Sequence, residues 1–172
     1  MANKDKPLKR WSPEWPELKT PAGTLTGCIK DEIIIARLGT ICYLWTHVEE
    51  QMIGFFNDLI GTENSMETAR QIFRAIINQK TRIDVMRTLL THGRHNKNKD
   101  QNYDHILDEF DKTNRMRNNY IHGLWWSHED GHTYLQSPSV DEMGERQARR
   151  VTVKELDNYI KRLMKFQLMI QF

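Results

Sequence analysis

A long apolar stripe in the first third of the chain constrains the fold more than any other feature. Its positions alternate in steps of four and three residues, the spacing of one helix face, and comprise Ile34, Leu38, Ile41, Trp45, Val48, Met52, Phe55 and Leu59. Ile35, Cys42, Phe56 and Ile60 widen the stripe. We therefore predict a helix over 31–60, ended by Gly61 and packed against partners on more than one side. Cys42 is expected to be a small core residue.

Three more helices are predicted from their apolar periodicity. The second covers about 64–92, with an apolar face formed by Ala69, Ile72, Phe73, Ile76, Ile83, Met86 and Leu90. A polar, basic loop separates it from a third helix over 101–122, whose stripe consists of Tyr103, Leu107, Phe110, Asn114, Arg117 and Ile121. The last helix begins at the capping-box sequence Thr152-Val153-Lys154-Glu155.

The third and last helices are separated by a different pattern. Two short runs rich in aromatic residues flank Asp130-Gly131, which predicts a β-hairpin near 124–136. The predicted fold class is therefore all-α, a four-helix bundle over 29–172 with a small β-hairpin insert before the last helix.

Proline dominates the N-terminal segment. Four of the five prolines lie within the first 21 residues. Proline lacks an amide donor and biases the residue before it away from helix, so 1–28 is predicted to be a proline-rich extended arm. Trp11 and Trp15 in this arm are expected to pack on the domain or on a partner subunit.

Composition excludes several classes of protein. We expect no membrane association and no signal peptide, because no apolar run approaches the ~18 residues of a membrane span. Cys28 and Cys42 are isolated, which fits a reducing, cytoplasmic location. The histidines lack metal-ligand spacing, so neither a metal nor another cofactor is expected. The net charge of +2 is too small to indicate a nucleic-acid binder.

The small positive excess is concentrated in one segment. Residues 61–122 carry eleven Lys and Arg against eight Asp and Glu. This weakly favours an anionic ligand near the end of the third helix, although a solvated surface of mixed charge explains the same excess.

The third helix ends in the sequence Arg117-Asn118-Asn119-Tyr120-Ile121-His122-Gly123. Arg117 lies on the apolar stripe, so it needs an ion pair, a partner subunit or a phosphate to accept its charge. A fixed guanidinium beside an imidazole can bind and cleave a phosphodiester without a metal. The alternative is that both side chains only cap the helix and complement its dipole.

The spacing of these residues sets the geometry of such a site. Asn118 and His122 are four residues apart, so they share a helix face and can hydrogen-bond. Arg117 lies about 140° from His122 around an ideal helix. We therefore expect Arg117 and His122 to converge only if the helix end distorts at Gly123 or if two copies meet across a dimer axis.

The motif Arg117-Asn118-x-x-x-His122 resembles the signature of the HEPN superfamily. The sequence Leu107-Asp108-Glu109-Phe110-Asp111-Lys112 before it, and Gly123-Leu124-Trp125 after it, are similar to a bacterial branch of that family. In that branch a glycine and an aromatic-rich strand follow the histidine. The resemblance covers roughly residues 30–172 and excludes the N-terminal arm.

This resemblance implies a helical bundle that forms a homodimer in which two motifs face one cleft. In active members it implies a metal-independent endoribonuclease of the toxin or defence type. His122 would be the general acid/base, Arg117 would bind the scissile phosphate, and Asn118 would orient His122. Some toxin members carry a tyrosine two residues after the histidine, which a partner nucleotidyltransferase modifies. Leu124 occupies that position here, which places this mode of control in doubt.

Several basic and aromatic residues are candidates for contact with RNA. They are Lys112, Arg115, Trp125, Arg146, Arg149 and Arg150. The three later arginines can equally form a solvated face, and Trp125 can serve only in packing.

Three functional hypotheses follow from the sequence. The first is a homodimeric HEPN-like ribonuclease acting on RNA, and the second is a catalytically silent HEPN-like module for dimerisation or RNA binding. The third, a purely structural helical module, requires an internal carboxylate, such as Glu49 or Glu50, to neutralise Arg117. The sequence identifies no antitoxin or other regulator.

Overall fold

The computed structural model describes residues 18–20, 23–26, 29–61, 65–92, 101–128, 131–136 and 148–171. The helices in these ranges are α1 (Glu32–Ile60), α2 (Met66–Ala75), α3 (Gln79–His92), α4 (Gln101–His122) and α5 (Val153–Ile170). The strands are β1 (Leu18–Thr20), β2 (Gly23–Thr26), β3 (Leu124–His128), β4 (Thr133–Gln136) and β5 (Ala148–Val151). The described part of the chain is therefore mostly helical, as predicted, with one small antiparallel sheet.

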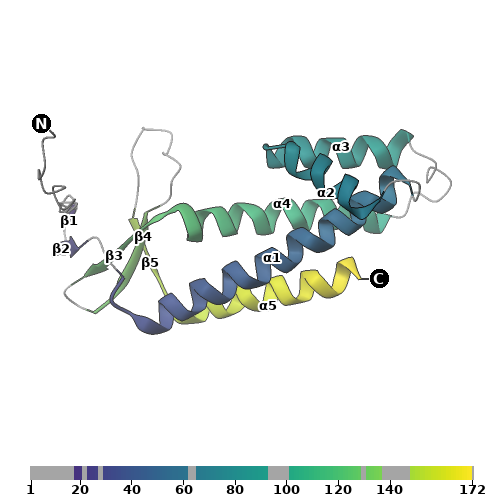
Figure 1. Cartoon of the computed structure of the whole chain (residues 1–172). Coiled ribbons are helices and arrows are strands. Elements are labelled where there is room, and N and C mark those ends of the chain that lie inside the picture. Colours follow the sequence, from purple (N-terminus) through teal and green to yellow (C-terminus); the bar gives the residue numbers. More distant parts are fainter. Residues whose placement is uncertain are drawn as a thin grey trace, which may run out of the picture.

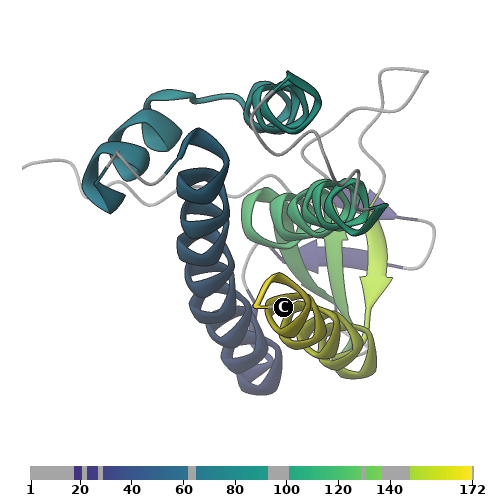
Figure 2. The same cartoon turned by 90° about the vertical axis from the view of Figure 1, so that its right-hand side faces the viewer.

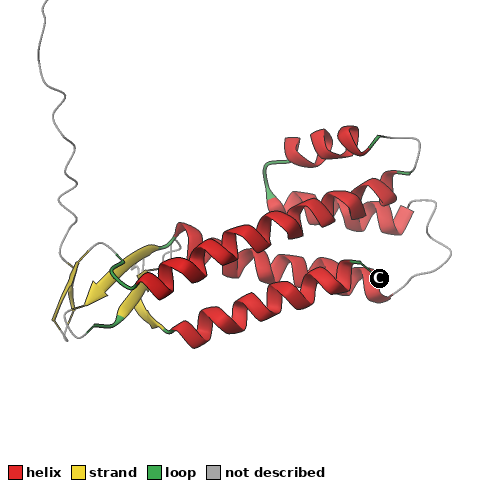
Figure 3. Ribbon diagram, turned by 60° about the horizontal axis from the view of Figure 1, so that its bottom comes forward, coloured by secondary structure: helices red, strands yellow, loops and turns green. Residues whose placement is uncertain are grey.

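Three long helices form the body of the molecule. Helices α1, α4 and α5 run side by side, and the sheet lies at the end where α4 stops and α5 begins (Figures 1 and 2). Helices α2 and α3 lie toward the other end, beside the C-terminal half of α1 (Figure 3). The end of α4 that carries the Arg117–His122 sequence is therefore the end that meets the sheet.

Helix α1 has the predicted bounds, and both of its ends are capped. The Asp31 side chain accepts hydrogen bonds from the amides of Ile33 and Ile34, at 2.9 and 3.2 Å. Gly61 ends the helix with φ of 97°, and its amide donates to the Asn57 carbonyl. Local capping chemistry therefore sets both ends of this helix.

The apolar stripe of α1 forms much of the core. Its buried members are Ile34, Ile41, Trp45, Val48, Met52, Ile53, Phe56 and Leu59. Trp45 stacks on Phe110 of α4 with ring centroids 5.6 Å apart, and Phe110 in turn contacts Phe166 of α5. The expectation for Cys42 was wrong, because its side chain is exposed. It lies on the edge of the wide stripe, where Ile35 is also 49% exposed.

The predicted second helix is divided in two. Ile76 leaves helical geometry with ψ of 95°, and Asn78 starts α3 by accepting hydrogen bonds from the amides of Lys80 and Thr81, at 2.8 and 3.3 Å. Asparagine favours helix N-caps because its side chain competes for backbone donors. The prediction of one continuous helix was therefore wrong at this point. Ile77, in the link, is 92% exposed.

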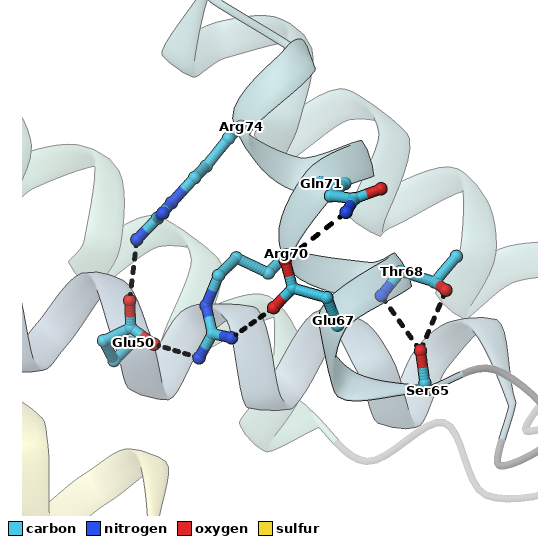
Figure 4. A network of polar contacts seen from close by, with 7 residues as sticks. All are labelled: Glu50, Ser65, Glu67, Thr68, Arg70, Gln71 and Arg74. Carbon is cyan, nitrogen blue, oxygen red and sulfur yellow. Dashed lines mark hydrogen bonds and ion pairs between the residues drawn. The ribbon is translucent and has the colours of Figure 1, made fainter.

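A network of charged side chains attaches α2 to α1 (Figure 4). Glu50 of α1 accepts hydrogen bonds from Arg70 and Arg74 of α2, at 2.8 and 3.0 Å. Arg70 also pairs with Glu67 on its own helix. Hydrogen bonding to Arg70 is the main cause of the lowered pKa of Glu50. Glu50 therefore serves to connect two helices.

The predicted hairpin is confirmed, but the sheet is larger than predicted. Strands β3 and β4 pair antiparallel with Trp125 opposite Leu135 and Trp126 opposite Tyr134. Strand β5 adds beside β4, and β2 and β1 add beside β3, which gives five strands in the order β1-β2-β3-β4-β5 within the described ranges. The expectation of only two strands was therefore wrong. The added strands have three or four residues each, too short to show a reliable alternation.

Part of the predicted N-terminal arm belongs to this sheet. Strands β1 and β2 lie within 1–28, and β2 pairs with β3 through Leu25 opposite His128. Trp11, Trp15 and Cys28 lie outside the described residues.

Helix α5 begins as its capping sequence predicts, with one difference. The Thr152 hydroxyl accepts a hydrogen bond from the Glu155 amide at 3.2 Å. The Glu155 carboxylate, which completes a capping box by turning back to the cap residue, is instead held by Tyr120 and Arg149. This difference links the start of α5 to the end of α4.

Candidate functional site

Arg117, Asn118 and His122 converge within a single chain. Arg117 Nη1 lies 3.0 Å from Asn118 Oδ1 and 3.0 Å from His122 Nε2. Helix α4 continues through His122, and the Gly123 amide still donates to the Asn119 carbonyl at 3.1 Å. The expectation that convergence needs a distorted helix end or a second copy was therefore wrong. The length of the arginine side chain is sufficient to bridge the two helix faces.

These contacts assign hydrogen-bonding roles to the imidazole and the amide. A guanidinium can only donate hydrogen bonds, so His122 Nε2 accepts from Arg117 and the imidazole proton lies on Nδ1. Asn118 Oδ1 also accepts from Arg117. The expected contact between Asn118 and His122 is not among the hydrogen bonds of the described residues. Asn118 therefore orients the guanidinium directly and the imidazole only through it.

The Arg117 guanidinium is anchored against the core by an aromatic ring. Its Cζ atom lies 5.9 Å from the centroid of the Trp45 ring, within the range of a cation–π interaction. Arg117 Nε is buried and finds no hydrogen-bond partner among the described residues. This placement explains how an arginine occupies a position on the apolar stripe of α4.

The carboxylates that could neutralise Arg117 are engaged elsewhere. Glu50 binds Arg70 and Arg74, and Glu49 lies 3.7 Å from Arg82. No carboxylate of the described residues forms an ion pair with Arg117. The condition required by the purely structural hypothesis is therefore not met in this part of the chain.

Exposure differs among the three residues. Arg117 and Asn118 are half-buried, whereas His122 is exposed. The guanidinium therefore presents a fixed positive charge, and the imidazole beside it is accessible to a ligand. This pair can bind an anionic group and move a proton next to it.

Gly123 allows the hairpin to pack directly against the last turn of α4. A Cβ atom at this position would lie 2.4 Å from the Asn119 carbonyl oxygen, 2.4 Å from Leu135 Cδ1 and 2.9 Å from the Gln136 carbonyl oxygen. Two of these neighbours are backbone atoms, which cannot move aside without shifting β4 or the helix end. The glycine after His122 is thus required by close packing.

Tyr120 and Glu155 are residues that the sequence analysis did not identify as parts of a site. The Tyr120 hydroxyl donates to Glu155 Oε1 at 2.7 Å, and Arg149 pairs with both oxygens of the same carboxylate, at 2.7 and 3.0 Å. The Trp125 indole donates to the Tyr120 carbonyl at 2.7 Å. These contacts join α4, β3, β5 and α5, and no local sequence pattern indicates them.

The environment of this network shifts the pKa values of Tyr120 and Glu155. Burial, followed by the neighbouring Glu155 carboxylate, raises the pKa of Tyr120 to about 12. Burial alone would raise the pKa of Glu155, but hydrogen bonds from Arg149 and Tyr120 outweigh burial and lower it. Both shifts favour the neutral tyrosine and the ionised carboxylate, which are the forms that the hydrogen bond requires.

The described residues predicted to bind RNA come from three elements, α4, β3 and β5. Lys112 and Arg115 are exposed on α4, where Arg115 pairs with Asp111. Arg149 and Arg150 are exposed on β5, and Arg149 is paired with Glu155. Trp125 is half-buried on β3, and Arg146 lies outside the described residues.

Comparisons with known proteins identify no relative. No family model, curated protein or solved structure matches this chain. Among the described residues, no three His, Cys, Asp or Glu side chains gather as a metal site requires. None of the described helices has the combined length and apolarity needed to cross a bilayer.

The different surroundings of Gly123 and Gly39 predict opposite effects on stability when each glycine is replaced by alanine. Gly123→Ala should lower the free energy of unfolding by about 1–3 kcal/mol, the usual cost of overpacking. Gly39→Ala, at an exposed position within α1 where nothing lies within 4 Å of the new Cβ, should raise it by about 0.5–1 kcal/mol. Urea unfolding of both variants checks this. Equal stability of Gly123→Ala and wild type would contradict the packing argument.

The raised pKa of Tyr120 predicts a loss of stability at alkaline pH. Because the folded-state pKa lies above the unfolded value of 10.0, this contribution is fully present below pH 10 and is lost as the pH rises toward 12. Tyr120→Phe should be less stable than wild type near pH 8, by about 1 kcal/mol for the lost hydrogen bond. Its stability should then fall less steeply above pH 10.

Urea unfolding midpoints measured at several pH values between 8 and 12 test this expectation. Tyr159, whose pKa burial also raises, should account for part of the remaining slope, so Tyr159→Phe serves as a comparison. Parallel pH profiles for Tyr120→Phe and wild type would show that Tyr120 contributes nothing to the alkaline transition.

Proposed function

We propose that this protein is a metal-independent endoribonuclease of the HEPN-like toxin or defence type and acts as a homodimer. One observation carries the proposal: Arg117 lies 3.0 Å from His122 and pairs with no carboxylate of the described residues. An arginine with an unneutralised charge beside an exposed imidazole fits a phosphodiester, whose anionic phosphate needs a cation and whose cleavage needs proton transfer.

The proposed reaction uses the ribose 2′-hydroxyl as the nucleophile. His122 removes the proton from this hydroxyl as its oxygen attacks phosphorus, and the bond from phosphorus to the 5′ oxygen breaks. The leaving 5′ oxygen takes up a proton, and the other product is a 2′,3′-cyclic phosphate. Arg117 stabilises the charge that develops on the phosphate oxygens, and Asn118 keeps the guanidinium in place.

The hydrogen bond between Arg117 and His122 gives this reaction a preparatory step. In the structure, the lone pair of His122 Nε2 accepts from Arg117 Nη1. A substrate phosphate that takes the guanidinium donors releases Nε2, which is then free to accept the proton of the 2′-hydroxyl. Phosphate binding and activation of the base are thereby coupled.

The same hydrogen bond is the observation that favours the alternative, a catalytically silent HEPN-like module for dimerisation or RNA binding. If Arg117 stays bound to Nε2 when RNA binds, the imidazole has no free lone pair for a general base. The two functions therefore differ in a single step.

The proposal includes a finer description of the fold and the cellular setting. We propose that α1, α4 and α5 form a four-helix bundle with the pair α2 and α3. The contacts of α2 with α1, and of α3 with α1 and α4, support this description. The order of these helices, followed by a hairpin directly after His122, supports the HEPN-like interpretation. A cytoplasmic location fits an enzyme that acts on cellular RNA.

Cleavage of a mixed RNA pool in EDTA tests the proposal. Wild type should cut RNA, spare DNA and leave a cyclic phosphate. His122→Ala should reduce the rate by ~10²–10⁴, the range of general acid–base catalysis. Arg117→Ala should lose a comparable amount, and Arg117→Lys should not restore it, because lysine lacks the planar fork of donors. Asn118→Ala should be milder.

Matched substitutions elsewhere provide the controls. His92→Ala and Arg87→Ala remove the same residue types from α3, where His92 is exposed and Arg87 pairs with Asp108, and both should retain the wild-type rate. If wild type cuts no RNA, while RNA binding or dimerisation persists in the His122, Arg117 and Asn118 variants, the silent module replaces the nuclease.

The proposed homodimer places the motif end of α4 at or beside the two-fold axis. Ile35 and Tyr43 lie on α1 at helical spacing and are 49% and 65% exposed. Large apolar side chains exposed on the helix whose Trp45 contacts Arg117 support an interface here. Such an interface should bury at least ~1,200 Å² in total.

Light scattering at micromolar concentration should therefore give the mass of a dimer. Ile35→Glu, alone or with Tyr43→Glu, should shift it toward the monomer, because a buried unpaired carboxylate opposes association. Met164→Glu on α5, at a site that is 52% exposed, should leave the mass unchanged. A monomeric wild type would rule out the dimer.

A further inference from the structure

The last turn of α4 is held from both its backbone and its side chains. A helix leaves its last four carbonyls without helical partners. In α4, the Asn119 carbonyl accepts from the Gly123 amide at 3.1 Å, and the Tyr120 carbonyl accepts from the Trp125 indole at 2.7 Å. The first strand of the hairpin thus supplies a side-chain cap to the helix that precedes it.

The side chain of Tyr120 is fixed as firmly as its carbonyl. Its ring packs between Trp125 and Tyr159, with centroid distances of 6.5 and 5.2 Å. Its hydroxyl donates to Glu155, whose carboxylate is itself held by both terminal nitrogens of Arg149. Only 3% of Tyr120 is exposed. Four elements therefore determine where this one residue lies.

Tyr120 lies in the same helical turn as His122, so fixing Tyr120 also fixes the position of the His122 side chain relative to Arg117. It lies between Arg117 and His122 in the sequence, and it points into the core while His122 is exposed. If the last turn rotated about the helix axis by the angle between consecutive residues, about 100°, the imidazole would move out of reach of the guanidinium. Restraining Tyr120 prevents that rotation.

We infer that Tyr120 and Trp125 are positioning residues, which keep His122 Nε2 within hydrogen-bond distance of Arg117 by fixing the last turn of α4. Neither residue contacts the Arg117 or His122 side chain in the described hydrogen bonds, so their effect passes through the helix end. This inference rests on the proposed function for its catalytic consequence. Its geometric content is independent of RNA.

The tautomer of His122 provides a readout that needs no substrate. Acceptance from Arg117 requires the imidazole proton to lie on Nδ1. Nitrogen-15 and proton NMR of the ring at pH 8, assigned with His122→Gln, distinguishes this tautomer from the one protonated on Nε2. Wild type should show the Nδ1-protonated form. Trp125→Phe and Tyr120→Phe should shift the ring toward a mixture of the two.

Trp126→Phe is the matched control. Trp126 is the next residue on β3, is 2% exposed, and its indole nitrogen finds no hydrogen-bond partner among the described residues. Its substitution disturbs packing without removing a cap from α4, so the His122 tautomer should stay as in wild type. In the cleavage assay, Trp125→Phe and Tyr120→Phe should lower kcat by ~10–10², the cost of misplacing a reacting group by about 1 Å. KM should change little.

Each outcome decides the inference. An unchanged tautomer in both Trp125→Phe and Tyr120→Phe would overturn it, and so would an equal shift in Trp126→Phe or a wild-type ring protonated on Nε2. If Trp125→Phe fails to fold, Tyr120→Phe alone decides, because it removes one hydroxyl and keeps the ring. If wild type cuts no RNA but the tautomer shifts as expected, the nuclease proposal fails and the positioning roles stand.

Discussion

The close approach of α4 and the β3–β4 hairpin at Gly123 determines how the sheet packs against the C-terminal end of α4. With no side chain between them, the helix passes into a strand over a single residue, and the Leu135 side chain and Gln136 backbone of β4 lie directly against the last helical turn. The same approach brings the Trp125 indole to the Tyr120 carbonyl. A larger residue at 123 would separate the hairpin from the helix, and the cap on the helix end would be lost with it.

The pairing of charges sets Arg117 apart from most other arginines of the described residues. Most arginines in the described chain are paired within or between helices: Arg70 and Arg74 with Glu50, Arg87 with Asp108, Arg149 with Glu155 and Arg162 with Glu109. Arg117 instead contacts neutral groups, an amide, an imidazole and an indole ring. Neutral partners stabilise its position without cancelling its charge, and an uncancelled charge next to an exposed imidazole is what an anionic ligand requires.

Features set by local chemistry were predictable from the sequence, and those set by tertiary contacts were not. The bounds of α1 and the hairpin followed from capping residues, periodicity and the Asp130-Gly131 turn. The break at Asn78 was missed because the apolar spacing of 64–92 continues across it. Strands β1, β2 and β5 are too short to carry a pattern; β2 and β5 pair with the edges of β3 and β4, and β1 pairs with β2. The contact of Tyr120 with Glu155 spans 35 residues of sequence, and the reach of Arg117 to His122 depends on a side-chain rotamer that helix geometry does not determine.

The nuclease and the silent module differ in whether a phosphate or His122 Nε2 takes the hydrogen-bond donors of Arg117. The Arg117 donors contact the His122 imidazole and the Asn118 amide oxygen. A phosphate brings a negative charge and can accept two parallel hydrogen bonds from a guanidinium, whereas the imidazole and the amide each offer a single neutral acceptor. A phosphate placed at the guanidinium should therefore displace His122 Nε2. Under the nuclease proposal, His122 becomes available as a base only when an anion binds Arg117, because its Nε2 otherwise accepts the hydrogen bond from Arg117.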